Sequence, residues 1–273
     1  SHNMHTAAVT GARGLIGELI VKELFDIGWN VKVLTRSDRK NFSPKITVIQ
    51  SDINNDEGLR SLLDGVDAIF HCAAELNDKE KMYSTNVEGT RKLINMAAKI
   101  RYISSGEHCV PIVIRAAIGR SWGQGAQHSQ ALHSMFCHVP GVKVVAPTTP
   151  HDAKGILISS IRDNNPVIFV EHRMLYKNAG YVPSKSYEIP IGKGRVLKEG
   201  KDITIVGASF TVEESLKAAE LLDEVGVNAE IIDPITLSPI DYHLIRDSVK
   251  KTNKLLVIDN GWTSFGFASE VIS

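Results

Sequence analysis

Cysteine is scarce in this sequence, and so are the features typical of secreted and membrane proteins. The 273 residues contain three cysteines, Cys72, Cys109 and Cys137, with no Cys-x-x-Cys spacing. An odd number without paired spacing argues against a disulfide framework and favours a reducing compartment. No apolar run is long enough to cross a bilayer, and the N-terminus lacks the charged and then apolar pattern of a signal peptide. The sequence therefore predicts a cytoplasmic protein with no membrane partner.

An excess of either charge is also absent. Lysine and arginine number 31, as do aspartate and glutamate, so the formal net charge is zero. This balance argues against nucleic-acid and anionic-membrane partners, and it leaves small molecules and other proteins as the expected ligands. With 43% hydrophobic and 23% charged residues, the composition is that of a globular protein. The length suffices for one large or two ordinary domains.

A glycine-rich turn lies between an apolar strand, expected over residues 5–10, and a helix expected to reach residue 27. The turn reads TGARGLIG. Glycines permit a tight turn and a close backbone approach, and the N-terminus of the following helix attracts a pyrophosphate. The pattern therefore predicts a dinucleotide site. Its expected cofactor-binding residues are Gly11, Arg13, Gly14, Leu15, Ile16 and Gly17.

The next expected strand, residues 31–34, ends in Thr35 and Arg36. An NAD-preferring site carries a carboxylate at this point for the ribose hydroxyls, whereas Arg36 would suit the 2′-phosphate of NADP. A solvated arginine at the end of a strand explains the residue equally well. The predicted cofactor is therefore NAD(P), and the choice between its two forms stays open.

Two further strands are expected over residues 47–51 and 67–71, and a helix is expected to run from residue 86 to 99. Asp52 and Ile53 follow the first strand, and Cys72, Ala73 and Ala74 follow the second. With the glycine turn, residues 7–99 resemble the extended short-chain dehydrogenases, the NAD(P)-dependent epimerase/dehydratase family. The resemblance implies a Rossmann-like parallel sheet. It also implies that Asp52 and Ile53 flank the adenine, and that Ala73 and Ala74 lie beside the pyrophosphate and nicotinamide.

The catalytic YxxxK pair of that family has no convincing counterpart. Residues 102–105, YISS, are expected to form the serine-bearing strand that precedes it. The one match to the pattern, Tyr181 to Lys185, contains Pro183 and is expected in a loop. The pair requires a helix so that tyrosine and lysine share one face.

Residues 125–176 contain an expected helix over 127–137, a strand over 142–146, a helix from residue 152 and a strand over 167–170. The motifs AQHSQ, PGVKVVAPTTPHDAKG and IRDNNPVIFVEHRMLY resemble the β subunit of the thiamine-diphosphate-dependent 2-oxo acid dehydrogenases, within the transketolase superfamily. The resemblance implies that His128 lines the active-site channel and helps bind a 2-oxo acid. An imidazole suits this role because it donates to a carboxylate or exchanges a proton near neutral pH. A capping or surface histidine is the alternative.

The same resemblance implies a structural potassium ion at the turn 160–166. The residues expected to enclose it are Ile112, Ser160, Ile161, Asp163 and Asn165. Carbonyl, carboxylate and amide oxygens are suitable ligands for a hard cation. An ordinary Asx-type turn explains the sequence Asp-Asn-Asn-Pro equally well.

The expected architecture is α/β, with a Rossmann-like half domain (5–105), a partial pyrimidine-type domain (106–176), a linker (177–201) and a partial C-terminal transketolase domain (202–273). The dehydrogenase-like third takes the place of the segment that carries the family's cofactor-activating glutamate. Thiamine diphosphate is therefore expected only with an α-type partner subunit; homo-oligomerisation is the other expected association. Two functions compete with a β-subunit-like role. They are an NAD(P)-dependent epimerase, dehydratase or reductase, and a hybrid scaffold that binds nucleotide without turnover.

Overall fold

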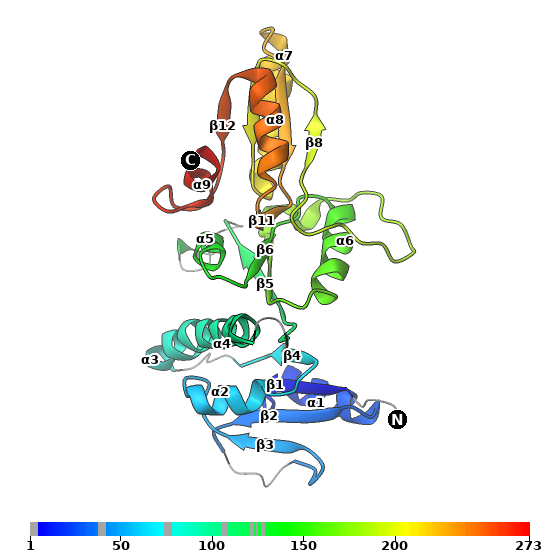
Figure 1. Cartoon of the computed structure of the whole chain (residues 1–273), viewed down its shortest axis with the longest axis vertical. Coiled ribbons are helices and arrows are strands. Elements are labelled where there is room, and N and C mark those ends of the chain that lie inside the picture. The colour runs from blue at the N-terminus through cyan, green and yellow to red at the C-terminus, as the bar shows by residue number, and fades with distance from the viewer. Residues whose placement is uncertain are drawn as a thin grey trace. The chain divides into compact units, whose positions relative to one another are not determined.

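The computed structural model describes residues 5–37, 42–73, 78–104, 107, 109–120, 123, 125–126 and 129–273 (Figure 1). Its contacts divide the chain into two units. The first comprises residues 1–114 and 163–166, and the second comprises residues 115–162 and 167–273. The predicted α/β class is confirmed, since both units contain parallel strands joined by helices.

Four parallel strands form the sheet of the first unit, in the order β3-β2-β1-β4. Thr10, the last residue of β1, lies beside Leu34 of β2 and His71 of β4. Because parallel strands end at the same edge, the turns that follow them come together there. The strands are β1 (Thr6–Thr10), β2 (Asn30–Thr35), β3 (Thr47–Gln50) and β4 (Ala68–His71).

Both faces of this sheet are buried. Ala7 belongs to a core cluster with Val21 of α1, whereas its neighbour Ala8 belongs to another cluster with Leu59 of α2 and Leu93 of α4. Successive strand residues point to opposite faces, so helices cover both sides of the sheet. The helices are α1 (Leu15–Asp26), α2 (Asp56–Leu63), α3 (Lys79–Met82), a π-helical segment η1 (Tyr83–Gly89) and α4 (Thr90–Ile103).

Residues 102 and 103, where a strand was expected to begin, belong instead to α4, which continues to Ile103; residue 105 lies outside the described residues. Leu93 and Ala97 are buried, and Met96 and Ile100 pack against the same core cluster. These four residues recur at helical spacing, so the apolar face of α4 extends almost to its end.

Two sheets contain the remaining strands, which belong to the second unit except for the first two residues of β5. In the first, with the order β11-β6-β7-β5, β6 and β7 are parallel and β11 is antiparallel to β6. Its strands are β5 (Val113–Ile118), β6 (Lys143–Val145), β7 (Val167–His172) and β11 (Thr236–Ser238). Short helices α5 (His133–Cys137) and η3 (Arg173–Lys177) accompany it. The longer helix α6 (Pro150–Ile161) begins with Pro150 and is capped by the Thr149 hydroxyl, which accepts the amide hydrogen of Asp152.

The second sheet has the order β12-β9-β10-β8, in which β8 alone is antiparallel to its neighbour. Ile205 and Ile231 of its central strands pack against Val212 and Ala219 of α7. Part of the expected linker, β8, thus forms an edge strand. The strands are β8 (Arg195–Lys198), β9 (Ile203–Val206), β10 (Ala229–Asp233) and β12 (Leu255–Val257), with helices α7 (Phe210–Glu224), α8 (Tyr242–Thr252) and α9 (Phe267–Ile272).

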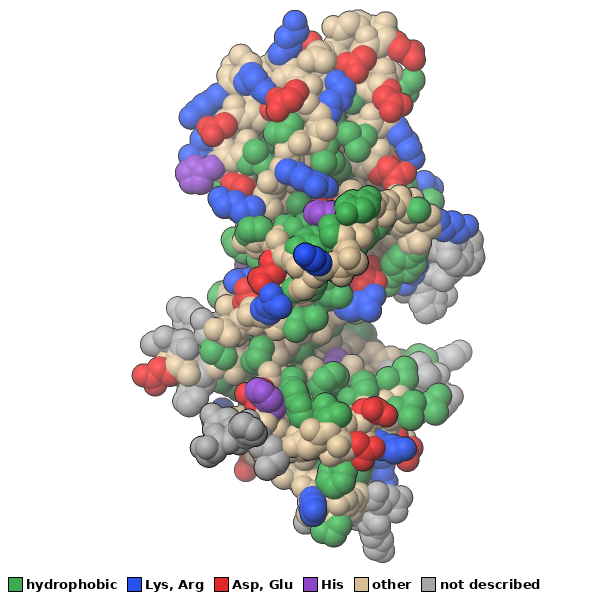
Figure 2. Space-filling model, turned by 90° about the vertical axis from the view of Figure 1, so that its right-hand side faces the viewer, with side chains coloured by type: hydrophobic (Ala, Val, Ile, Leu, Met, Phe, Trp, Pro, Cys, Tyr) green, Lys and Arg blue, Asp and Glu red, His purple; other side chains and the backbone are tan. Residues whose placement is uncertain are grey.

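Charged side chains of both signs intermingle over the C-terminal elements, at the top of the face shown in Figure 2. In the described part of the chain, no helix combines the length and the apolar character needed to cross a bilayer.

Candidate functional site

A cavity of about 240 Å³ lies in the first unit, where β1, β2, β3 and β4 end. Its wall brings together seven residues that the sequence places at a cofactor: Gly11, Arg13, Gly14, Arg36, Asp52, Ile53 and Ala73. Leu15, Ile16 and Gly17 lie outside this wall, and Ala74 lies outside the described residues. Sequence reasoning missed Thr10, Ala12, Leu34, Thr35, Ser37, Ser51, Cys72 and Thr85.

Gly11 is required by the geometry of the cavity wall. Its φ angle is +65°, and a methyl group on it would lie 2.5 Å from the carbonyl carbon and oxygen of Cys72 and 2.6 Å from the amide nitrogen of Ala73. A side chain at Gly17 would meet the carbonyl oxygen of Gly11. The turn can therefore bring its backbone against the end of β4 only because both positions are glycine.

The N-terminus of α1 adds backbone donors to the cavity. Gly14 is the N-cap, and among the described residues no side chain caps this end. The amide groups of the first turn of a helix have no acceptor within the helix, and they form a site for anions. Leu15 and Ile16 are 84% and 66% exposed, and they point away from the core. Gly17 is buried.

Two arginines give the cavity a positive side. Arg36 is exposed and makes no hydrogen bond or ion pair with the residues that the structure describes. The Arg13 guanidinium donates to the Ser37 hydroxyl and lies 5.9 Å from the centre of the Phe42 ring. Asp52 is the single acidic group among the described residues of the wall, and its Oδ1 accepts the Asn54 amide hydrogen at 2.8 Å. This arrangement favours an anionic ligand at the end of β2.

His71 lies directly behind the wall. Its Nδ1 is 2.6 Å from Thr10 Oγ1, and its Nε2 is 2.8 Å from Thr90 Oγ1. Burial lowers the pKa of His71 to about 4, so the ring is neutral near pH 7. In the sequence, the role of His71 is indicated only by its position at the end of β4, directly before the wall residue Cys72.

The structure describes the residues expected at a potassium site, but it does not describe the histidine expected at a 2-oxo acid site. His128 lies outside the described residues. Of the potassium set, Ile112, Asp163 and Asn165 fall in the first unit, and Ser160 and Ile161 in the second. Asp163 Oδ1 accepts the Asn165 amide hydrogen at 2.8 Å, the bond of an ordinary Asx turn. Ile112 and Ser160 are buried, and Ile161 is exposed. Both the role of His128 and the potassium site stay predictions.

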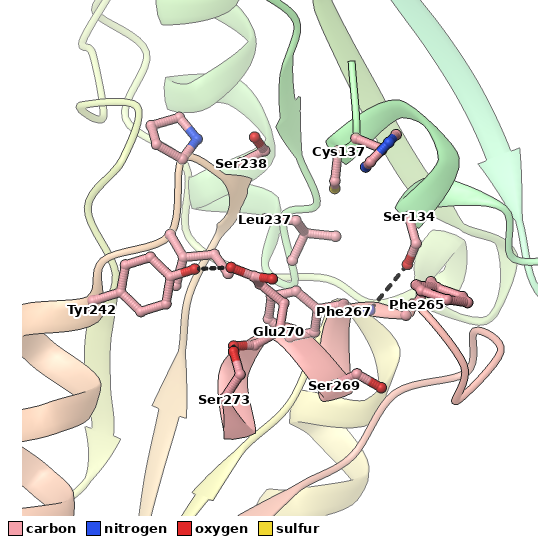
Figure 3. A pocket seen from close by; sticks show the side chains of 14 residues that line it. Ser134, Cys137, Leu237, Ser238, Tyr242, Phe265, Phe267, Ser269, Glu270 and Ser273 are labelled. Carbon is pink, nitrogen blue, oxygen red and sulfur yellow. Dashed lines mark hydrogen bonds between the residues drawn. The ribbon is translucent and has the colours of Figure 1, made fainter. Parts of the chain in front are cut away.

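The second unit contains a cavity of about 760 Å³ between α5, β11 and α9, where the sequence predicts no site (Figure 3). Tyr242 Oη donates to Glu270 Oε1 at 2.5 Å, and Phe267 N donates to Ser134 Oγ at 3.0 Å. Burial, and next the charge of Asp259, raise the pKa of the Cys137 thiol to about 12. Cys137 is therefore a protonated thiol and a poor nucleophile.

Another cavity of this unit, about 440 Å³, lies between α6 and β7. Its cations already have hydrogen-bond partners: Arg115 Nε contacts Glu171 Oε1 at 2.5 Å, and Lys154 Nζ donates to backbone carbonyls of residues 183–185. Among the described residues, no cluster of three or more histidine, cysteine or acidic side chains could hold a metal ion. The described part of the second unit therefore does not fit a diphosphate with a divalent metal.

Comparison with protein families identifies the chain as a composite. Residues 7–110 match the NAD dependent epimerase/dehydratase family, residues 79–178 the transketolase pyrimidine binding domain, and residues 192–273 the transketolase C-terminal domain. The first two matches overlap over residues 79–110, so α4 fits both.

Individual relatives are β subunits. The chain is 44% identical over 180 residues to the acetoin:2,6-dichlorophenolindophenol oxidoreductase subunit beta of Cupriavidus necator, a match that covers 66% of this chain and 53% of the relative. It is 41% identical over 193 residues to the mitochondrial pyruvate dehydrogenase E1 component subunit beta of Mus musculus, covering 69% and 54%. The chain thus spans about half the length of these curated relatives.

A solved structure extends the likeness to the whole fold. The split gene transketolase, described as an inactive beta4 tetramer, matches 97% of this chain and 77% of its own chain with a TM-score of 0.63. The sequence identity is 20%, so this match concerns the fold alone.

Proposed function

We propose that this chain is a β-subunit-like component of a thiamine-diphosphate-dependent 2-oxo acid dehydrogenase, of the pyruvate or acetoin type, joined to an NAD(P)-binding segment. The 41–44% identity to β subunits supports the first part, and the close approach of Gly11 to β4 supports the second. We propose as partners an α-type subunit and a small-molecule substrate, with a homo-oligomer as the other association. The small, odd number of cysteines and the absence of Cys-x-x-Cys spacing favour the cytoplasm.

The α-type subunit is the proposed source of the diphosphate and metal contacts, because Arg115 and Lys154 already have partners and the described residues contain no cluster of metal ligands. The contribution that we propose for His128 is to bind and orient the 2-oxo acid carboxylate, with the imidazole as donor.

The test is reconstitution with an α-type subunit, thiamine diphosphate and magnesium, followed by an assay of 2-oxo acid decarboxylation. Turnover that depends on both subunits is the expected result, and absence of both assembly and cofactor binding would reject the β-like role. We expect His128→Ala to lower turnover about tenfold, the effect of losing one hydrogen bond to a charged group. His138→Ala, a nearby histidine outside the motif, is the control and is expected to retain turnover.

A second function, nucleotide binding without hydride transfer, is favoured by one observation. Tyr181 is 83% exposed in a segment without regular secondary structure, so Tyr181 and Lys185 do not share a helical face as the catalytic pair requires. Binding of NADP⁺ without any oxidation or epimerisation of sugar nucleotides would support this function. Hydride transfer that is lost in Tyr181→Phe would contradict it.

For the nucleotide itself, we propose NADP over NAD, because Arg36 and Arg13 flank the end of β2. Arg36→Asp is expected to lower NADPH affinity at least about tenfold while NADH affinity is kept or improved. Titration with both nucleotides measures the ratio of their dissociation constants. Arg60→Asp makes the same charge change on α2, away from the cavity, and is expected to leave this ratio unchanged. An unchanged ratio in Arg36→Asp would contradict the preference for NADP.

A further inference from the structure

We propose that His71 is a positioning residue of the nucleotide cavity, holding the Thr10 hydroxyl and, through it, the Ala73 amide in the wall that faces the ligand. The inference rests on the proposed binding of NAD(P) in this cavity. Thr10 and Ala73 both line the wall, whereas His71 lies behind it and contacts Thr10 at 2.6 Å. His71 therefore acts on the ligand only through these neighbours.

We assign the tautomer in which His71 Nδ1 accepts a hydrogen bond. The Ala73 amide donates to Thr10 Oγ1 at 3.3 Å, so the hydroxyl hydrogen of Thr10 remains available for His71 Nδ1. In the neutral ring the other nitrogen then carries the hydrogen and donates to Thr90 Oγ1 at 2.8 Å. The low pKa that burial gives His71 keeps the ring neutral, so one of its two nitrogens is an acceptor. The result is a continuous chain of hydrogen bonds from Ala73 to Thr90.

This chain connects the ends of β1 and β4 to the first turn of α4. The same turn is fixed on its other side: a methyl group on Gly89 would lie 2.5 Å from Ile53 Cγ2, and Lys92 Nζ donates to the Asn54 carbonyl at 2.6 Å. Ile53 also lines the cavity. His71 thus connects the first turn of α4, through hydrogen bonds, to the part of the wall formed by Gly11, Cys72 and Ala73.

Two substitutions each remove one of the two side-chain hydrogen bonds of His71 and keep the other. In His71→Asn the side-chain amide replaces Nδ1 and keeps the acceptor for Thr10, but it loses Thr90. In His71→Gln the amide reaches the position of Nε2 and keeps Thr90, but Thr10 loses its acceptor. Each variant loses one hydrogen bond, so the two are expected to have similar melting temperatures. A merely structural histidine would make them equal in nucleotide affinity as well.

The experiment titrates NADPH and NADH into the full chain and its variants, and measures hydrogen exchange of the Ala73 amide in the ligand-free proteins. We expect His71→Gln to weaken binding about tenfold and to accelerate Ala73 exchange, and His71→Asn to stay within about twofold of the parent in both. Thr10→Val should behave like His71→Gln, and Thr90→Val like His71→Asn.

Equal affinities and equal Ala73 exchange in the two His71 variants would overturn the proposal while leaving nucleotide binding intact. If the parent chain binds neither nucleotide, the NAD(P) assignment fails and the positioning role fails with it. Faster Ala73 exchange confined to His71→Gln and Thr10→Val would then show that the hydrogen-bond chain exists without this ligand.

Discussion

Gly11→Ala is expected to abolish binding of NADPH and NADH, with a loss of affinity of at least about a hundredfold. The added methyl group would lie 2.5 Å from the Cys72 carbonyl and 2.6 Å from the Ala73 nitrogen, so either β4 or the glycine turn must shift. Both segments line the cavity. Because the neighbours are backbone atoms, no change of side-chain rotamer can relieve the contact.

Gly65→Ala is a closely matched control. Gly65 has a φ angle of +62°, close to the +65° of Gly11, but a methyl group on it meets nothing within 4 Å. It should lose about 1 kcal/mol of unfolding free energy through backbone strain alone and keep its nucleotide affinity. Gly11→Ala should lose more, about 2–4 kcal/mol, because strain and steric overlap add. Isothermal titration and urea unfolding measure both quantities. Nucleotide affinity within about threefold of the parent in Gly11→Ala would contradict the assignment of the cavity.

Asp233→Asn is expected to stabilise the protein at pH 8. Asp233 is completely buried, and its Oδ2 has no hydrogen-bond partner among the described residues. Burial, followed by the nearby charge of Asp152, raises the pKa of Asp233 to about 6, against opposing hydrogen bonds from Ile235 and Thr148 and the charge of Arg195. The native state therefore holds the proton of Asp233 more tightly than the unfolded state does.

The sign of the pH dependence follows from this difference. Between the ordinary pKa near 4 and the native pKa near 6, the native state binds more protons, so stability falls as pH rises through this window. The difference between these two pKa values corresponds to about 3 kcal/mol of unfolding free energy at pH 8, and an uncharged asparagine avoids this cost. Urea unfolding at pH 4 and pH 8 should show nearly equal stabilities at the lower pH and a more stable variant at the higher pH. A variant that is less stable at pH 8 would contradict the argument.

Glu230→Gln provides a control of opposite sign on the same strand. Glu230 is also buried, but the ammonium group of Lys251 contacts it and the Gly200 amide donates to it at 3.2 Å. Although burial acts to raise the pKa of Glu230, these hydrogen bonds lower it overall. Its ionised form thus stabilises the native state above the ordinary pKa of glutamate and loses that contribution as pH falls. Glu230→Gln should destabilise the protein at pH 8, and the difference should diminish in acid.

Much of the nucleotide cavity could be predicted because its residues follow strands. Gly11, Asp52 and Ala73 each come directly or shortly after a parallel strand, and parallel strands end at one edge of their sheet. His71 escaped prediction because its partners, Thr10 and Thr90, lie 61 and 19 residues away. Side-chain hydrogen bonds over such separations have no periodic signature in the sequence.

Short edge strands and the partners of buried charged residues could not be predicted from the sequence either. All four residues of β8 are half-buried, without the alternation that predicts a strand, and pairing with β10 defines the element. Residues 102–105 were expected to form a strand because the epimerase/dehydratase family has a serine-bearing strand at this point, but the apolar face of α4 extends the helix to Ile103. In the second unit, Arg195 lies opposite Asp233 in the strand register and contacts Asp152 of α6.

The sequence by itself determined the α/β class, the glycine turn and its composite resemblance, because hydrophobic periodicity and local turn chemistry are properties of neighbouring residues. The tertiary structure alone decided which backbone the glycine turn meets, which hydroxyls His71 joins and which buried carboxyl oxygens have no hydrogen-bond partner among the described residues. These features depend on distances between segments that are far apart in the chain, and packing fixes them only when the sheets form.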